Sequence, residues 1–176
     1  MYFRSMQKST IDFRLIKLER NGYHPVCTVA INHIDALMVI DTGASHTVLD
    51  KKQAARFLPE NKIKLSEVKS SGLGTNDMMS AYATFDYFIL GDLVLRRRKT
   101  IILDLAHINL AYETMQLPSI AGVIGCDILK KYKARINFST KKLVIKSWCV
   151  YIKSLHNRVN NLLDYVKKDV HFHTVF

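Results

Sequence analysis

Short segments of alternating hydrophobic and polar residues fill the first 148 positions of the 176-residue chain. Residues 11–18, IDFRLIKL, alternate with the period of two that is typical of a half-buried strand. Residues 25–41 predict a hairpin with its turn at Asn32 and His33. Further strand pairs are predicted over residues 67–90, around a Ser- and Gly-rich loop, over 92–105, with a tight turn at the arginine run, and over 134–148, with a turn at 139–141.

Helical patterns are fewer. Residues 46–58 predict a short helix that begins near Asp50, and residues 121–132 predict a buried strand followed by a helix. From 150 to 168, apolar residues recur at helical spacing, which predicts one amphipathic helix. Many short strands without alternating strand–helix units favour a mostly-β closed or sandwich-like domain.

Composition places the chain among globular proteins, since 48% of its residues are apolar. No apolar run reaches the ~18 residues of a membrane span, and the first 20 residues lack the apolar core of a signal peptide. The three cysteines have neither zinc-site spacing nor an even count, so we expect a cytoplasmic protein. The amphipathic helix is expected to pack on its own domain or on a second subunit rather than on a membrane.

The formal net charge of +11 raises nucleic acid as a partner. The basic residues cluster at 96–99, 130–135 and 141–146, but no nucleic-acid-binding motif accompanies them, so solvated faces and turns are the favoured interpretation. In the tail, His171 and His173 could hold a metal only weakly, because two ligands make a poor site, and a frayed terminus is favoured.

The segment MVIDTGASH places a carboxylate, Asp41, directly after an apolar run. Burying a lone carboxylate is costly, and the sequence supplies no neighbouring cation. It supplies Thr42, a hydroxyl donor, and Gly43, which allows a tight turn with N–H groups open to the acid. Ala44 and Ser45 keep the surroundings uncrowded. These residues predict an exposed acid on a stiff strand end with room for a substrate above it.

A pair of facing carboxylates can act as acid and base together, because both cannot ionise comfortably and one proton is shared. The ionised member would draw a proton from water while the other polarises a substrate carbonyl. The chain contains Asp-Thr-Gly once, so the second copy must come from another chain, most simply by twofold symmetry.

The stretch VIDTGASHTVL resembles the active-site strand and turn of retropepsin-like aspartic proteases. A second feature of that family, two apolar residues followed by Gly and then a helix, is matched by GVIGCDILKKY. Between the two lies SSGLGTN, where the family places its flap. The resemblance implies a retropepsin-like closed β-barrel over residues 1–148, one lobe per chain, with a short helix after the second motif. The amphipathic helix and tail over 149–176 are an addition to the pattern of that family.

The resemblance also implies roles for individual residues. Asp41 matches the catalytic acid, and Thr42 the residue whose hydroxyl bonds across the twofold axis. Gly43 matches the turn residue whose N–H faces the carboxylates, and Ala44 the next position lining the cleft. Gly125 matches the small residue that lets the second motif pass behind the catalytic turn.

In the segment that matches the flap, Gly72 and Gly74 are the candidate tip residues. The resemblance implies no metal and no cofactor. It implies a homodimeric aspartic endopeptidase acting on peptide or protein substrates. The alternative is a module that keeps the fold for binding or scaffolding with weak turnover, and a nucleic-acid-associated protein is a third hypothesis.

Other polar residues near the motifs have less favoured functional interpretations. Asp127 is expected to cap or electrostatically support the helix that it begins rather than to serve as a second catalytic acid. Ser45 and His46 are a poor catalytic pair, because adjacent residues on extended backbone point to opposite faces. Cys126 has no evident base and is expected to be a small buried hydrophobe.

Overall fold

The computed structural model describes residues 2–18, 22–58, 64–72 and 75–152. The described residues within 8–145 form one compact unit, and those within 2–7 and 146–152 belong to another. The elements are β1 (Tyr2–Asp12), β2 (Arg14–Lys17), β3 (Tyr23–Ile31), β4 (Ile34–Ile40), β5 (Val48–Asp50), α1 (Lys51–Ala54), β6 (Lys64–Gly72), β7 (Thr75–Leu90), β8 (Leu93–Leu103), α2 (Ala106–Thr114), β9 (Gly122–Ile124), α3 (Cys126–Leu129), β10 (Arg135–Asn137) and β11 (Lys142–Ile152). No helix in the described ranges is long and apolar enough to cross a membrane.

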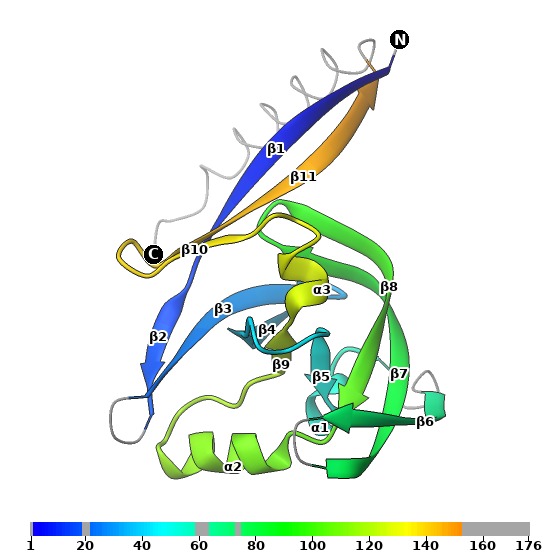
Figure 1. Ribbon diagram of the computed structural model, residues 1–176, viewed down its shortest axis with the longest axis vertical. Helices are drawn as coiled ribbons and strands as arrows, with labels where there is room; N and C mark the ends of the chain where they lie inside the picture. The colour runs from blue at the N-terminus through cyan, green and yellow to red at the C-terminus, as the bar shows by residue number, and fades with distance from the viewer. Residues whose placement is uncertain (1, 19–21, 59–63, 73–74, 153–176) are drawn as a thin grey trace, which may run out of the picture. The chain divides into compact units, whose positions relative to one another are not determined.

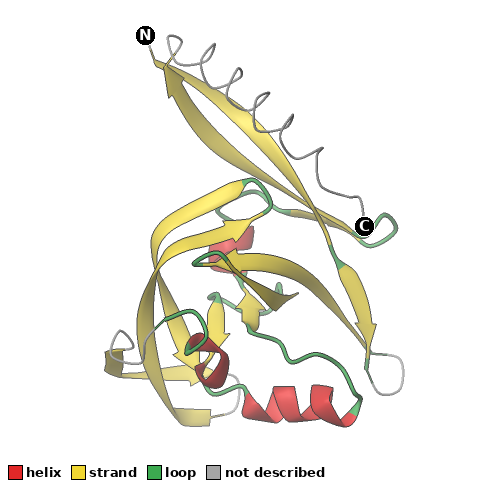
Figure 2. Cartoon of the chain, turned by 180° about the vertical axis from the view of Figure 1, so that it is seen from behind, coloured by secondary structure: helices red, strands yellow, loops and turns green. Residues whose placement is uncertain are grey.

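Strands dominate the unit of residues 8–145 (Figure 2). Its main sheet has the order β2-β3-β4-β9-β5-β8-β7-β6, and an additional pairing of β3 with β7 closes the central strands into a barrel (Figure 1). Side chains such as Val29, Met38, Phe85 and Phe88 fill the interior and are almost completely buried. The predicted mostly-β closed barrel is confirmed.

The hairpin of β3 and β4 turns at Asn32 and His33, as predicted, with φ of 47° and 67°. Two successive left-handed residues are the geometry of a two-residue turn whose twist suits a hairpin. The Asn32 side chain fixes the turn to its surroundings, because its Oδ1 accepts from Tyr87 N–H at 3.0 Å and its Nδ2 donates to Phe57 O at 3.1 Å.

Strands β4 and β9 form a parallel pair in the middle of the main sheet. β9 runs beside β4 in the register Met38↔Gly122 and Ile40↔Ile124, and its other edge pairs with β5. Gly122 allows this approach, since a Cβ there would lie 2.1 Å from Val48 O. The ends of β4 and β9 therefore lie side by side, which brings the two sequence motifs together.

The expected turn at the arginine run is wrong, because β8 continues through it as a single strand. Tyr87 pairs with Arg96 and Phe85 with Arg98, so the register with β7 is unbroken, and only Arg97 departs from extended backbone, with φ of 49°. Long-range pairing with β7 thus overrides the local signal of four consecutive cations.

Helix α2 was not predicted. Its N-cap residue, Leu105, makes no side-chain capping bond, and the first turn contains no acidic residue. The preceding residue, Asp104, binds the start of the helix instead, because its Oδ1 accepts from Ala106 N–H at 2.9 Å. Packing supplies its stability: Tyr112 is buried among Val26, Ile120 and Val123.

The short helix after Asp50 is confirmed, since the Asp50 side chain accepts from Gln53 N–H at 3.0 Å as its N-cap.

At the other end of the chain, β11 extends to Ile152, so the predicted start of the amphipathic helix at 150 is wrong. The rest of the predicted helix lies outside the described residues, and so do His171 and His173 in the tail after it.

Candidate active site

Asp41 lies at the first position after β4, held at the strand end by its backbone. Its N–H donates to Ile124 O at 3.1 Å, which continues the pairing of β4 with β9. The carboxylate is partly exposed, and its Oδ1 accepts from Gly43 N–H at 2.7 Å. Asp41 therefore combines a fixed backbone with an accessible carboxylate.

The turn after Asp41 depends on the small size of Gly43. A Cβ at Gly43 would lie 3.2 Å from Asp41 Oδ1, closer than an ordinary contact. Thr42 is exposed on the same turn, and Ala44 is half-buried behind it. The glycine leaves its N–H free to approach the acid directly.

The loop of residues 41–47, called the Asp41 loop below, is supported from behind by the start of α3. Cys126 N–H donates to Ala44 O at 2.8 Å, and Asp127 N–H donates to Ser45 O at 3.1 Å. A Cβ at Gly125 would lie 2.4 Å from the backbone carbon of His46, so only glycine fits there. The structure thus brings Gly125 against the Asp41 loop, which is the close approach that the resemblance implied.

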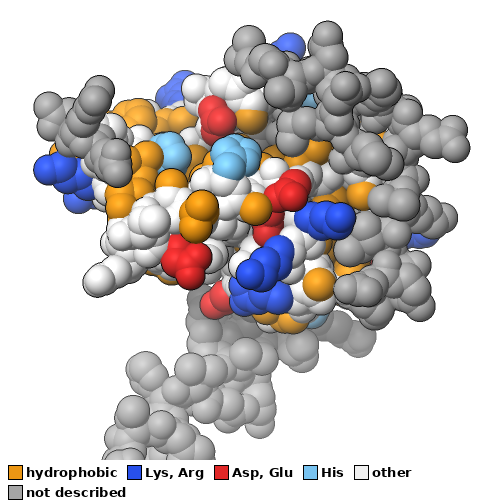
Figure 3. Space-filling model, turned by 90° about the horizontal axis from the view of Figure 1, so that it is seen from below, with side chains coloured by type: hydrophobic (Ala, Val, Ile, Leu, Met, Phe, Trp, Pro, Cys, Tyr) orange, Lys and Arg blue, Asp and Glu red, His pale blue; other side chains and the backbone are white. Residues whose placement is uncertain are grey.

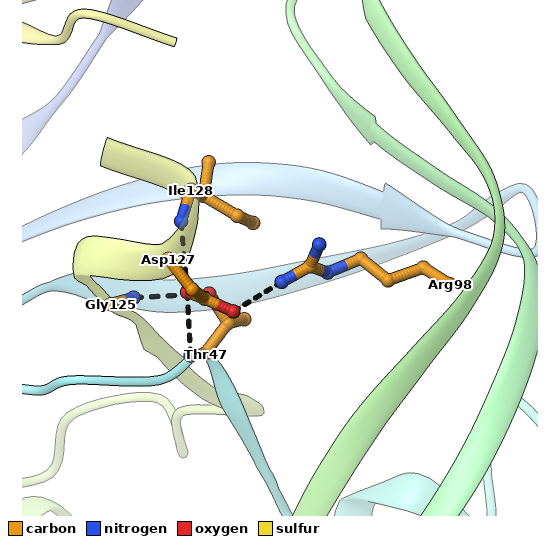
Figure 4. A network of polar contacts seen from close by, with 5 residues as sticks. All are labelled: Thr47, Arg98, Gly125, Asp127 and Ile128. Atoms are coloured by element: carbon orange, nitrogen blue, oxygen red, sulfur yellow. Dashed lines mark hydrogen bonds and ion pairs between the residues drawn. The ribbon is translucent and has the colours of Figure 1, made fainter. Parts of the chain in front are cut away.

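A network of polar contacts joins the end of this loop to α3 and β8 (Figure 4). Asp127 Oδ1 accepts from Thr47 N–H at 2.8 Å, from Thr47 Oγ1 at 2.7 Å and from Ile128 N–H at 2.9 Å. Its Oδ2 accepts from the Arg98 guanidinium, and Gly125 N–H donates to Thr47 Oγ1 at 3.1 Å. Asp127 therefore ties together three segments that are far apart in the sequence.

Of the two roles expected for Asp127, capping or electrostatic support, the structure agrees with the second, and the expectation for Cys126 needs correction. The N-cap residue of α3 is Gly125, and Asp127 lies within the first turn, so Asp127 supports the helix without capping it. Cys126 is half-buried rather than buried, and its Sγ donates to Thr42 O at 3.1 Å. Both findings follow from the place where α3 begins. Its first residues lie against the Asp41 loop, so Cys126 contacts the exposed turn at Thr42 instead of the core.

Arg98 is the functional residue that sequence reasoning missed. It faces inward, opposite the fully buried Phe85, and its side chain is 17% exposed. A half-buried cation needs a partner carboxylate, and Asp127 provides it. If β8 had been predicted as one strand paired with β7, Arg98 would have been expected on the same side as the buried Phe85. The predicted turn at the arginine run hid this relationship.

A cavity of about 450 Å³ adjoins Asp41 and Thr42. Its other walls come from the start of β3, from β9, from α2 and from β10, through residues that are mainly apolar: Tyr23, His24, Pro25, Val39, Ile40, Ile108, Ile120, Val123, Ile136 and Phe138. Ligand-binding sites in proteins are commonly cavities of this kind, mostly apolar with a few polar groups.

One polar bond lies in the wall of this cavity. His24 Nδ1 and the Tyr112 hydroxyl are 2.8 Å apart, which links β3 to α2. Burial raises the pKa of Tyr112 to about 12, so the phenol keeps its proton into the alkaline range in which an exposed tyrosine would ionise. The unpredicted helix α2 is thus tied to the cavity beside Asp41.

The predicted flap region forms an antiparallel hairpin of β6 and β7. Gly72 ends β6 and pairs with Thr75, whereas Gly74 lies outside the described residues. Within the described part of the chain, no group of three or more His, Cys, Asp or Glu side chains is arranged to hold a metal ion.

Charged side chains of both signs occur on the face shown in Figure 3, where lysine and arginine groups lie near carboxylates and apolar side chains. The described basic side chains on that face therefore do not form a continuous basic surface of the kind that a nucleic-acid backbone needs.

The model of the retroviral aspartyl protease family matches residues 21–137. A retropepsin-like aspartic protease from Rickettsia conorii is 15% identical, with a TM-score of 0.51 over 86% of this chain and 98% of that chain. EIAV protease complexed with the inhibitor HBY-793 is 19% identical (TM-score 0.48, 70% of this chain, 98% of that chain). The retroviral protease-like domain of Ddi1 from Leishmania major is 15% identical (TM-score 0.46, 68% and 86%). No curated protein sequence matches the chain.

Proposed function

We propose that this chain, which belongs to the retroviral aspartyl protease family, is an aspartic endopeptidase. Two Asp41 carboxylates, one from each subunit of a homodimer, would activate a water molecule that hydrolyses a peptide bond. The substrate would be a peptide or protein bound in extended form, with the β6–β7 hairpin of each subunit adding to its backbone as a neighbouring strand does.

The observation that carries the proposal is the way in which Asp41 is held. Its backbone is fixed to Ile124, and its Oδ1 is fixed by Gly43 N–H. In the described part of the chain Oδ2 has no hydrogen-bond partner, so it is free to bind water or a second carboxylic acid. A general base needs this combination of fixed position and an open oxygen.

The reaction would proceed by direct attack of water. One Asp41 is ionised and takes a proton from the water, while the protonated Asp41 of the other subunit donates its proton to the carbonyl oxygen of the peptide. The resulting tetrahedral diol then collapses: the C–N bond breaks, the leaving nitrogen gains a proton, and the two acids return to sharing one proton. No covalent enzyme intermediate is formed.

A dimer is supported by features of the single chain. Each chain contributes one Asp-Thr-Gly sequence, so the acid pair requires two chains. β10 is the last strand of the sheet β1-β11-β10, which leaves one edge of it unpaired within that sheet. An open strand edge is a ready surface for pairing with another chain. Phe138, which follows β10 and lines the cavity beside Asp41, is 57% exposed.

The test is the substitution Asp41→Asn, with Asp35→Asn as the matched control, since Asp35 is exposed and lies on β4, the strand that leads into Asp41. Cleavage of a broad peptide library should be lost in Asp41→Asn and kept in Asp35→Asn. Sedimentation should show that all three proteins are dimers. A dimer that cleaves no peptide at acid or neutral pH would favour the alternative, a binding or scaffold module. Cleavage by Asp41→Asn at the wild-type rate would exclude the mechanism.

A further inference from the structure

A second cavity, of about 220 Å³, lies at the far end of the Asp41 loop. It is built from the loop, from the two long strands β7 and β8, and from α3, through the residues His46, Thr47, Tyr82, Lys99, Ile101 and Asp127. Its size suits a single side chain rather than a length of peptide backbone. The function proposed above assigns it no role.

The charges that line this cavity are unbalanced. Asp127, its one carboxylate, is already fully engaged, because Oδ1 accepts from Thr47 and Ile128 and Oδ2 accepts from Arg98. Arg98 neutralises that charge. Lys99 remains as a positive group, and none of the carboxylates whose side chains the structure describes forms an ion pair with it. Among its described lining residues, the cavity therefore offers a cation and no available anion.

Lys99 has a defined position despite its exposure. Its Nζ lies over the ring of Tyr82, 4.3 Å from the centroid. A lysine held on an aromatic face keeps its ammonium near one place. Because Lys99 pairs with Thr84 on β7, two residues beyond Tyr82, both side chains stand on the same face of the strand pair. Lys99 and His46 thus border one cavity.

The cavity is also close to the acid along the chain. His46 is five residues after Asp41 in the Asp41 loop, and the backbone of His46 packs on Gly125, which directly follows the Ile124 that binds Asp41 N–H. An extended peptide advances about 3.3 Å per residue, with alternate side chains on one face. A peptide bound across Asp41 would therefore present to this cavity a side chain a few residues from the scissile bond, not one beside it.

We propose that this cavity binds the carboxylate of a glutamate or aspartate side chain of the substrate, and that Lys99 and His46 are specificity-determining residues. The inference rests on the proposed peptidase function and adds to it a substrate class. Lys99 would supply the charge, Thr47 and Ile101 the walls, and His46 a further polar contact at the loop.

The expected discrimination is moderate, because both Lys99 and His46 are exposed. A charge-assisted hydrogen bond at a partly solvated site changes binding by roughly tenfold. The peptidase should therefore cleave a peptide with Glu at the second, third or fourth residue from the scissile bond about tenfold faster, in kcat/KM, than the same peptide with Gln there.

Matched peptide sets with Glu, Gln or Lys at each of those positions test the proposal. Wild-type protein should prefer Glu at one position, Lys99→Gln should lose the difference between Glu and Gln, and Lys99→Glu should prefer Lys. His46→Gln should reduce the preference by a smaller factor. The control is Lys131→Glu, which makes the same charge change at an exposed lysine that also lies over a tyrosine ring, Tyr132, but borders neither cavity.

Binding measurements separate this inference from the peptidase function. The same peptides are titrated into Asp41→Asn protein, with and without Lys99→Glu, and their affinities are compared by calorimetry. A Glu preference that Lys99→Glu reverses supports the acidic-side-chain site even if no cleavage is found. Asp41-dependent cleavage with equal kcat/KM for Glu and Gln at every position, or an equal effect of Lys131→Glu, would overturn the inference and leave the peptidase function standing.

Discussion

Thr47 and Asp127, separated by 80 residues in the sequence, share a hydrogen bond of 2.7 Å between Oγ1 and Oδ1. The same threonine hydroxyl accepts from Gly125 N–H at 3.1 Å, so one side chain joins the Asp41 loop to the segment behind it. Thr47 is 2% exposed. Bonds at such a site are protected from competing water, and each buried partner left unmatched is costly.

Replacing Thr47 by valine should destabilise the protein. The shape is nearly kept, but the Gly125 N–H loses its acceptor and Asp127 one donor, and a buried unpaired group costs about 1–3 kcal/mol in the free energy of unfolding. Urea denaturation measures this. Thr28→Val, at an exposed position on β3, is the control and should change the free energy of unfolding by less than about 0.5 kcal/mol.

Arg98 and Asp127 should prove energetically coupled. Their side chains are 17% and 26% exposed, so the ion pair is only partly screened by water. Removing one partner leaves the other charge half-buried and unpaired. In a double-mutant cycle of Arg98→Met and Asp127→Asn, we expect a coupling free energy of about 1–3 kcal/mol from urea denaturation. A coupling near zero would mean that the pair does not hold β8 to α3.

Gly125→Ala should unfold the protein more easily and disturb the Asp41 loop. The added Cβ would meet His46 and Ala44 backbone atoms at 2.4 to 2.9 Å, and backbone cannot move aside as a side-chain tip can. Overpacking of this kind costs about 1–3 kcal/mol or more. Gly43→Ala meets only a side-chain oxygen at 3.2 Å, so its stability, measured by the same denaturation, should change less.

Stability should fall in alkali in a way that depends on Tyr112. Its pKa is raised by burial to about 12 in the folded protein, against about 10 in an unfolded chain. Between these values the unfolded state loses the proton while the folded state keeps it, so the free energy of unfolding decreases as pH rises from 10 towards 12. Below pH 10 the contribution is complete.

Comparing wild type with Tyr112→Phe isolates this contribution. The wild-type protein should lose roughly 1–3 kcal/mol more stability than the variant between pH 9 and pH 11.5, as measured by urea denaturation. Cys27, whose pKa burial also raises to about 12, is present in both proteins and cancels in the difference. Parallel curves for the two proteins would show that the Tyr112 phenol ionises equally in both states.

Local signals sufficed for several elements. The turn at Asn32 and His33 follows from two residues that tolerate left-handed backbone, and the start of α1 from the capping ability of Asp50. The apolar lead into Asp41 predicted a strand end with an accessible acid. These features depend on residues that are neighbours in the chain, and the sequence alone therefore determined them.

Tertiary structure decided the rest. Arg98 faces inward because its pairing with β7 fixes the register of β8. Its charge is matched there because Asp127 of α3 forms an ion pair with it. Helix α2, whose N-cap residue makes no side-chain capping bond, buries Tyr112 against other elements, and the cavity at Lys99 combines four segments. Periodicity states which face of a segment is apolar. It does not state which distant segment will cover that face, because the partner is chosen by the packing of the whole barrel.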